Sequence, residues 1–310
     1  MVSKVNAWND KSRLAGALLC WSLSGCTEVL DIPADPQLVE TGPWRCLNEA
    51  APAPAPAPTS AEQAQVVVQA CDFITDCTTV VSGLSARLCD KRDVGCNSPR
   101  LHGITDTAGV FRFPVPTAGG GFDGYLQVDS PLSLCTEASV FGAVAGAVLC
   151  GLIAPLCDVA APDDRCLVTR FAPAMLFFNP PVVHDVERPV ALQMFPSSGL
   201  PAIISAAGIQ LDPTAGSLFI QALDCDGKPA AGVRYELAPA APGVSSLYVN
   251  NGVVSSSGTK TDESGVGGFV RVPPGFVSVI GYNSDSVPIG QIGVQSAAST
   301  LTYSALFPSP

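Results

Sequence analysis

Short apolar runs separated by turn residues recur along the chain from residue 62 to residue 310. Residues 84–88 read LSARL and residues 233–237 read VRYEL, so apolar and polar side chains alternate. A period of two places successive side chains on opposite faces of an extended strand, one of which packs on a core. The 29 glycines and 28 prolines are spread between these runs, where turns are expected. The pattern predicts an all-β protein.

Two stretches of the chain repeat the same order of features. In each, an apolar strand and an alternating strand precede a short polar sequence, which reads TDTAGV at 105–110 and TDESGV at 261–266. In a tight turn between antiparallel strands, the Asp side chain accepts backbone N–H bonds and the Gly adopts a positive φ. The predicted turn residues are Asp106, Gly109, Asp262 and Gly265.

The repeated order resembles the carboxypeptidase regulatory-like domain. The second copy has GV at 232–233, TDESG at 261–265 and PGF at 274–276. The first copy keeps TDTAGVFRF at 105–113, but it has a glycine-rich break at 119–121 and a cysteine-bearing insertion from Cys89 to Cys96. The resemblance implies a prealbumin-like Greek-key β-sandwich. Modules of this family usually act as accessory, stabilising or binding units.

The amino terminus resembles the signal of a bacterial lipoprotein. Basic residues precede an apolar segment at 14–23, which is too short to span a membrane. Residues 23–26 then read LSGC, with small residues before a cysteine. The resemblance implies cleavage before Cys26 and lipidation of that cysteine, and Thr27 in place of Asp favours the outer membrane. The alternative is an ordinary export signal in which the cysteine is incidental.

The cysteine count agrees with export. Of twelve cysteines, Cys20 leaves with the signal and Cys26 becomes the anchor, so an even set of ten remains. In a secreted chain such a set predicts up to five disulfides, although the pairing does not follow from sequence. The net charge of −11 repels phosphate backbones, so we expect no nucleic-acid partner.

These patterns divide the chain into four parts. Residues 1–25 are a lipoprotein signal peptide, and residues 26–61 are a lipidated N-terminus with an Ala/Pro-rich linker. Within that linker, APAPAPAPTS at 51–60 favours an extended spacer that holds the folded part off the bilayer. Residues 62–195 form the first β-sandwich domain with its Cys-rich insertion, and residues 196–310 form the second.

A small helical or disulfide-pinned connection is expected between the strands. Residues 200–207 are apolar and end at Gly208, which predicts a short helix between the domains. Residues 138–157 are uncharged and as long as a membrane span, and they contain Cys150. A buried helix or disulfide-pinned crossover is preferred for this stretch, and a membrane span is the alternative.

The sequence offers no catalytic constellation. A hydrolase needs a nucleophile, a base and an orienting acid, but no G-x-S-x-G occurs and the only histidines are His102 and His184. The sequence at Asp224, Asp226 and Gly227 matches the start of a calcium loop, but the twelfth position is Tyr235 rather than an acidic residue. We therefore predict a plain turn there, with no catalytic residue, metal site or cofactor.

The predicted function is a non-enzymatic, membrane-anchored lipoprotein of the cell envelope that acts as a binding, adhesion or structural module. Its partners would be the membrane, through the lipid anchor, and an envelope protein or glycan. One alternative is a carbohydrate- or peptidoglycan-binding accessory protein, with Trp44, Tyr248 or Tyr282 forming an aromatic platform. Another is a metal-dependent enzyme that uses His184 with Asp185.

Overall fold

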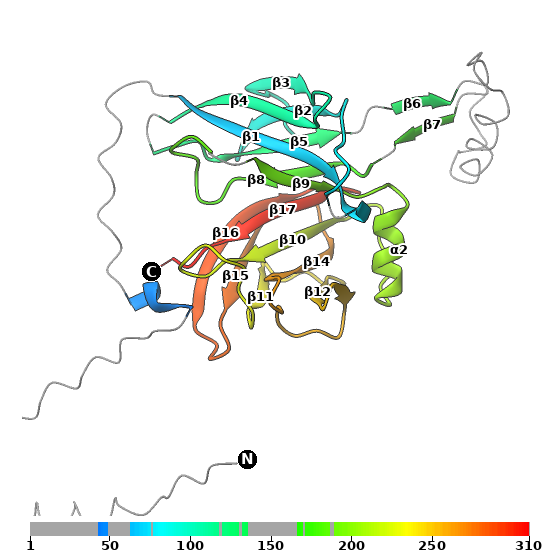
Figure 1. Cartoon of the computed structure of the whole chain (residues 1–310). Helices are drawn as coiled ribbons and strands as arrows, with labels where there is room; N and C mark the ends of the chain where they lie inside the picture. The colour runs from blue at the N-terminus through cyan, green and yellow to red at the C-terminus, as the bar shows by residue number, and fades with distance from the viewer. Residues whose placement is uncertain are drawn as a thin grey trace, which may run out of the picture. The chain divides into compact units, whose positions relative to one another are not determined.

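The computed structural model describes residues 43–48, 63–75, 77–117, 120–129, 132–135, 166–169, 171–186 and 189–309 (Figure 1). Cys26 and the signal lie outside them. The described residues belong to one compact unit, Thr41–Pro310. The strands in order are β1 Gln63–Asp72, β2 Ser85–Asp90, β3 Leu101–Ile104, β4 Val110–Pro116, β5 Gly124–Asp129, β6 Leu132–Cys135, β7 Cys166–Thr169, β8 Ala174–Phe177, β9 Val190–Met194, β10 Gly216–Ala222, β11 Arg234–Ala238, β12 Ser245–Asn250, β13 Val253–Ser255, β14 Val266–Val272, β15 Gly275–Tyr282, β16 Pro288–Ser296 and β17 Leu301–Leu306. The described helices are α2 Gly199–Ala206 and short 3-10 turns at Arg45–Asn48 and Phe73–Thr75. The prediction of an all-β sandwich fold is confirmed.

The two halves of the chain repeat the same strand pairing. In the first half, β1 pairs antiparallel with β4 and parallel with β9. In the second half, β10 pairs antiparallel with β14 and parallel with β17. Opposite these strands lie β8-β5-β2-β3 in the first half and β16-β15-β11 in the second. The sequence repeat therefore corresponds to a repeat of topology.

A single nine-stranded sheet runs through both halves. Its order is β13-β12-β14-β10-β17-β8-β5-β2-β3, and the two halves meet where β17 pairs parallel with β8. Leu301, Thr302 and Tyr303 lie opposite Ala174, Met175 and Leu176 in this register. Figure 1 shows β8 beside β17 between the upper and lower strands. The predicted boundary at residue 195 thus falls between β9 and α2, while hydrogen bonds join the strands on either side of it.

Strand β8 is buried on both faces because it lies between two cores. Ala174 and Leu176 belong to the core that β1, β4 and β9 cover. Met175 and Phe177 point the other way, into the core of the second half. Alternation along a strand sends neighbours to opposite faces, so a strand between two cores contains a continuous apolar run.

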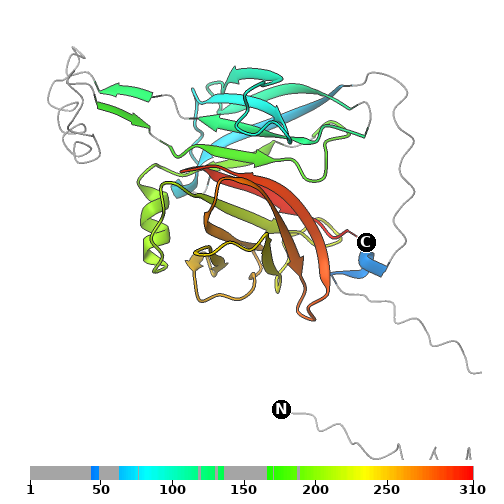
Figure 2. The same cartoon turned by 180° about the vertical axis from the view of Figure 1, so that it is seen from behind.

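The predicted helix at 200–207 is present as α2. Its buried residues Leu200 and Ile204 pack with Phe219 and Leu301 from the nine-stranded sheet. Figure 2 shows α2 beside the second-half strands. The helix therefore covers the sheet face opposite β11, β15 and β16, and it separates the apolar residues there from solvent.

The chain before the Ala/Pro tract is fastened to the second half. Cys46 forms a disulfide with Cys225, and the Cys225 N–H donates to the carbonyl of Pro43 at 3.0 Å. Trp44 packs against the second-half core. The tract at 51–60 therefore connects two points of the folded body, Asn48 and Gln63. The tract itself, predicted to be an extended spacer, lies outside the described residues.

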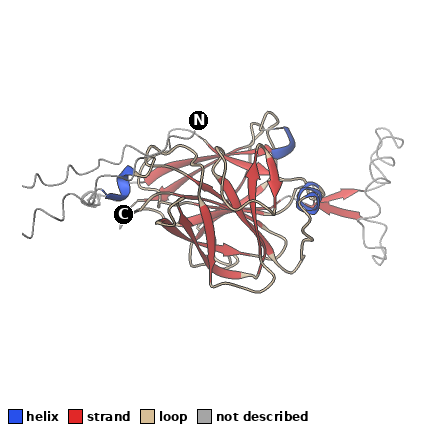
Figure 3. Cartoon of the chain, turned by 90° about the horizontal axis from the view of Figure 1, so that it is seen from below, coloured by secondary structure: helices blue, strands red, loops and turns tan. Residues whose placement is uncertain are grey.

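A hairpin of β6 and β7 projects from the body in Figures 1 and 3. Cys135 lies opposite Cys166 in its register. Among the described helices, none combines the length and the hydropathy of a membrane-spanning segment. The stretch at 138–157, for which a span was the alternative, lies outside the described residues.

Candidate functional site

The first predicted turn forms around Asp106, but it connects β3 and β4, which lie in different sheets, rather than two strands that pair with each other. Its carboxylate accepts the N–H groups of Ala108 and Val110, both at 2.9 Å, and Gly109 has a φ of +69°. These backbone bonds, with Arg112 at 3.4 Å, keep the pKa of the Asp106 carboxyl below its usual value. A Cβ at Gly109 would lie 2.7 Å from the carbonyl oxygen of Ala70. The turn therefore requires Gly for both its φ and its space.

The second predicted turn has the same aspartate and glycine positions but a different second backbone donor. The Asp262 carboxylate accepts the N–H groups of Ser264 at 2.9 Å and Asn251 at 2.6 Å. Its pKa is lowered, chiefly by the hydrogen bond from the Ser264 hydroxyl. Gly265 again has a φ of +69°, and a Cβ there would approach the carbonyl oxygen of Ala222 at 2.5 Å.

The threonine before each of Asp106 and Asp262 also stabilises the turn. Thr105 Oγ1 accepts the N–H of Leu84 at 2.9 Å, and Thr261 Oγ1 accepts the N–H of Val233 at 3.0 Å. Both threonines are buried. Each hydroxyl thereby holds the turn to the neighbouring chain segment, so the repeated TD sequence has a structural role at both of its residues.

Two further turns share this pattern. The Asp224 carboxylate accepts the N–H groups of Asp226 at 2.8 Å and Lys228 at 2.9 Å, which agrees with the predicted plain turn. The side-chain oxygen of Asn283 accepts those of Asp285 at 3.0 Å and Val287 at 2.9 Å. The Asn283 turn was not predicted from the sequence, because Ser286, with a φ of +63°, occupies the position that is Gly in the other three turns.

The two histidines lie in different surroundings. His102 is exposed on β3, where its Nε2 lies 3.4 Å from the Ser85 hydroxyl. His184 lies in an exposed loop, and the neighbouring Asp185 carboxylate accepts the Gln65 N–H at 2.6 Å. Within the part of the chain that the structure describes, no group of three or more His, Cys, Asp or Glu side chains is arranged to hold a metal ion.

The aromatic residues suggested for a glycan platform do not form one. Tyr248 is 2% exposed and stacks against Tyr235, with ring centroids 6.1 Å apart. Tyr282 has the Arg234 guanidinium over its ring at 4.6 Å. Trp44 packs against the second-half core. Tyr248 is therefore too buried to stack on a sugar, and one face of the Tyr282 ring is already occupied by a cation.

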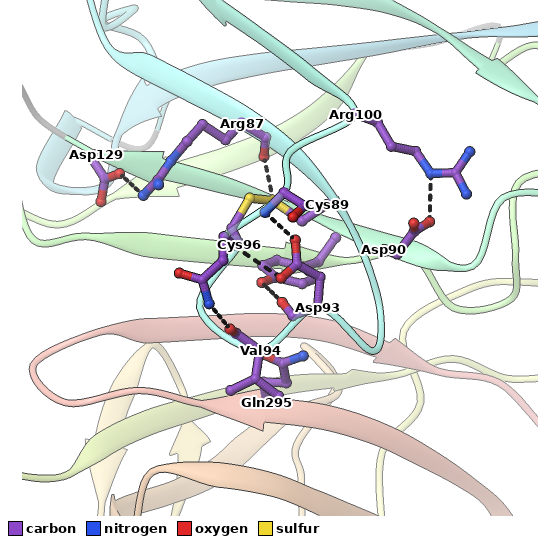
Figure 4. The surroundings of a disulfide bond; sticks show 12 residues. Arg87, Cys89, Asp90, Asp93, Val94, Cys96, Arg100, Asp129 and Gln295 are labelled. Carbon is purple, nitrogen blue, oxygen red and sulfur yellow. Dashed lines mark hydrogen bonds and ion pairs between the residues drawn. A yellow bond between two sulfur atoms is a disulfide. The ribbon is translucent and has the colours of Figure 1, made fainter.

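The loop between β2 and β3 is the best candidate for a binding element (Figure 4). The Cys89–Cys96 disulfide closes it at its base. Inside the loop, the Asp93 carboxylate accepts the N–H groups of Asn97 at 3.0 Å and Ser98 at 2.9 Å. These contacts fix the backbone of a segment that has no regular secondary structure, and a fixed loop loses little conformational entropy on binding.

The inner side of the loop rests on the protein core. The hydroxyl of Tyr125 donates to the Asp93 carbonyl at 2.6 Å, and the ring stacks on Phe177 with centroids 4.8 Å apart. Burial, with the nearby Asp93 charge, raises the pKa of Tyr125 to about 12. The side-chain amide of Gln295 from β16 donates to the Lys91 carbonyl at 2.6 Å. The loop is therefore tied to both halves of the chain.

The outer side of the loop is exposed and mixed in character. Val94 is 58% exposed, and Arg92 and Asn97 are exposed beside it. At its end, Arg100 forms an ion pair with Asp90 at 2.6 Å and lies over the Phe122 ring at 5.9 Å. Binding residues are often carried on loops positioned by a rigid scaffold. The cysteines indicated this insertion in the sequence, but nothing in the sequence predicted the hydrogen bonds that Asp93 and Tyr125 form.

Comparisons with known proteins identify no family. No family model matches the chain, and no curated protein matches it. Among solved structures it is similar to shaft pilin SpaA from Lactobacillus rhamnosus GG, with 12% identity, a TM-score of 0.23, and coverage of 80% of this chain and 99% of that chain. It is also similar to the Bacillus anthracis TIE protein (10% identity, TM-score 0.21, 80% and 34% coverage) and to a streptococcal ancillary pilin (13%, 0.20, 80% and 70%). Similarities of this extent carry no conclusion about function.

Proposed function

We propose that this chain is an exported lipoprotein, attached to a membrane through Cys26, that acts as a binding, adhesion or structural module without chemistry of its own. The supporting observation is the oxidised state of the folded body. Six cysteines of the described residues form the disulfides Cys46–Cys225, Cys71–Cys77 and Cys89–Cys96. Such bonds persist in oxidising compartments outside the cytoplasm.

The disulfide at Cys46 limits the length of the tether in this proposal. If Cys26 is acylated, only residues 27–42 separate the membrane from the fastened segment. A fully extended chain of that length reaches at most roughly 55 Å. The body would therefore remain close to the membrane surface, even though the chain contains an Ala/Pro tract further along.

The joined sheet supports a structural or adhesive role. The nine-stranded sheet and the Gln295–Lys91 bond connect the two halves, so a force applied to one half is transmitted through backbone hydrogen bonds to the other. In this proposal each half is a prealbumin-like module of the carboxypeptidase regulatory-like type, and the β2–β3 loop provides the contact surface.

The anchor is tested by metabolic labelling with radioactive palmitate. The unmodified protein should be labelled, and Cys26→Ser should abolish the label. Cys20→Ser is the matched control because Cys20 lies within the predicted signal, and labelling should persist. Labelled Cys26→Ser protein, or unlabelled cytoplasmic protein with free thiols at Cys46 and Cys225, would overturn the proposal.

The contact surface is tested by retention on isolated envelope fractions and on purified peptidoglycan. Arg92→Ala and Asn97→Ala should weaken retention, because both side chains are exposed on the fixed loop. Val253→Ala is the control, since Val253 is 66% exposed on the distant strand β13. Retention that is unchanged in both loop variants would show that the loop is not the contact surface.

A further inference from the structure

Arg271 occupies an unusual backbone position in β14. The register between β10 and β14 shifts at this point, since Gly216 lies opposite Val272 and Ser217 lies opposite Val270. Arg271 is therefore the extra residue of a β-bulge, and its φ is +61°. Bulges redirect a side chain, and strained backbone at non-glycine residues is concentrated at functional sites.

The Arg271 guanidinium has few partners for a partly buried cation. Nη2 donates to the Ser245 hydroxyl at 2.6 Å, whereas Nε is buried and has no acceptor among the described residues. Five other described arginines form ion pairs within 4.0 Å, namely Arg45, Arg87, Arg100, Arg112 and Arg234. Among the described residues, none places a carboxylate within 4.0 Å of the Arg271 guanidinium, although the chain carries a net charge of −11.

This cation lines an open cleft of about 270 Å³. The walls include Pro242, Pro273 and Pro274, and Asp212 lies on the same lining. The volume is slightly below the roughly 300–1,000 Å³ of pockets that hold drug-sized ligands. The cleft therefore suits the end of a ligand, with the proline rings as apolar walls around a charged group.

We infer that this cleft binds a ligand that ends in a carboxylate, with Arg271 as the residue that recognises it. Guanidinium presents a planar fork of donors that matches a carboxylate, and such charge-assisted bonds are stronger than neutral ones. The inference does not depend on the lipid anchor or on the β2–β3 loop, so either proposal can fail without the other.

Asp212 is the other charged group that lines the cleft. Its Oδ1 accepts the Thr214 N–H at 2.8 Å and the Thr214 hydroxyl at 2.6 Å, so this oxygen already has two donors. The hydrogen bonds from Thr214, with the Arg271 charge, lower the pKa of the Asp212 carboxyl. A ligand with a cationic group beside its carboxylate would satisfy both charges and should bind more tightly than a simple acid.

Calorimetric titration of the purified, disulfide-bonded protein tests the inference. The probes are a hexapeptide with a free C-terminal carboxylate, the same peptide as its C-terminal amide, and digalacturonic acid. The free acid should bind, and the amide should bind at least tenfold more weakly because it lacks the charge that Arg271 recognises. Binding of digalacturonic acid alone would support a carboxylate site that takes an acidic sugar. No binding of either acid at millimolar concentration would overturn the inference.

Substitutions separate recognition from stability. Glycine adopts a positive φ without strain, so Arg271→Gly should have an equal or higher Tm and at least tenfold weaker carboxylate binding. Arg271→Lys keeps the positive charge without the planar fork of donors, so its affinity should lie between those of the unmodified protein and Arg271→Gly. Lys260→Ala, at an exposed basic residue outside the cleft lining, is the control and should bind normally. Unchanged binding in Arg271→Gly, or a large loss of Tm in both Arg271 variants with binding intact, would make Arg271 a structural tie to Ser245.

Discussion

The disulfide between Cys46 and Cys225 should contribute more to stability than either short-range disulfide. It closes a loop with a sequence separation of 179, whereas Cys89 and Cys96 are separated by 7. In the chain-entropy model the restriction of the unfolded state grows with the logarithm of loop length, which gives about 5 kcal/mol for the long loop and about 2.4 kcal/mol for the short one. The noncovalent contacts of this segment include an exposed Arg45–Asp226 ion pair, which contributes little.

The matched variants are the double substitutions Cys46→Ala with Cys225→Ala, and Cys89→Ala with Cys96→Ala. At about 2 °C per kcal/mol for a body of this length, Tm should fall by about 10 °C in the first and about 5 °C in the second. Thermal and urea unfolding followed by circular dichroism under non-reducing conditions measure both losses.

Trp44 provides a local measurement of the same contact. The chain has three tryptophans, and only Trp44 remains after residue 25. Its emission should shift to longer wavelength in the Cys46/Cys225 variant, where the segment can leave the core, and stay unchanged in the Cys89/Cys96 variant. If the long-loop variant loses no more stability than the short-loop variant, the loop-entropy argument is refuted. Peptide mapping that finds Cys46 bonded elsewhere would refute the connection itself.

Three further results are expected. Gly109→Ala should lower the free energy of unfolding in urea by about 3 kcal/mol, because residue 109 has a positive φ and a carbonyl oxygen lies close to its Cβ position. Gly227→Ala has a similar φ of +73° but open space around it, so it should lower that free energy by only about 1 kcal/mol; equal losses would contradict the close approach at Gly109. Tyr125→Phe removes the hydrogen bond to the Asp93 carbonyl, so it should lower the free energy of unfolding by about 1 kcal/mol and speed amide hydrogen exchange in the β2–β3 loop. Unchanged exchange would show that this hydrogen bond does not hold the loop. The pKa values of Asp106 and Asp262 are lowered in the folded protein, so both carboxylates stabilise it above the usual pKa of 3.8, and this stabilisation is lost as the pH falls below that value. The Asp106→Asn/Asp262→Asn variant should therefore show a flatter dependence of Tm on pH in that range.

Local features were accessible to the sequence because they depend on neighbouring residues. The alternation at 84–88 placed β2, and the TD sequences placed two turns with their aspartate and glycine roles. Asn251 and Gly252 both have positive φ in the β12–β13 hairpin, which is the conformation that an Asn-Gly pair favours in a two-residue hairpin turn.

The candidate site was only partly accessible. The spacing of Cys89 and Cys96 marked an insertion, but whether these cysteines bond to each other or to distant ones depends on distance in the folded protein. Tyr125 supports the loop from another strand, and its sequence context is that of any core aromatic residue. Arg271 follows a valine in an ordinary strand pattern, and only the pairing with β10 reveals the bulge.

The sequence alone therefore determined the class of fold, the alternating strands at 84–88 and 233–237, the polar turns and the oxidised character of the cysteines. Each of these follows from side-chain periodicity or composition over a few residues. Tertiary structure decided which distant segments meet. The apolar run of β8 is compatible with many partners, and only packing between two cores selects β17 beside it. In the same way, the partner of Cys46 lies 179 positions away in the sequence. This disulfide depends on the packing of Trp44 against the second-half core, and no local sequence preference predicts it.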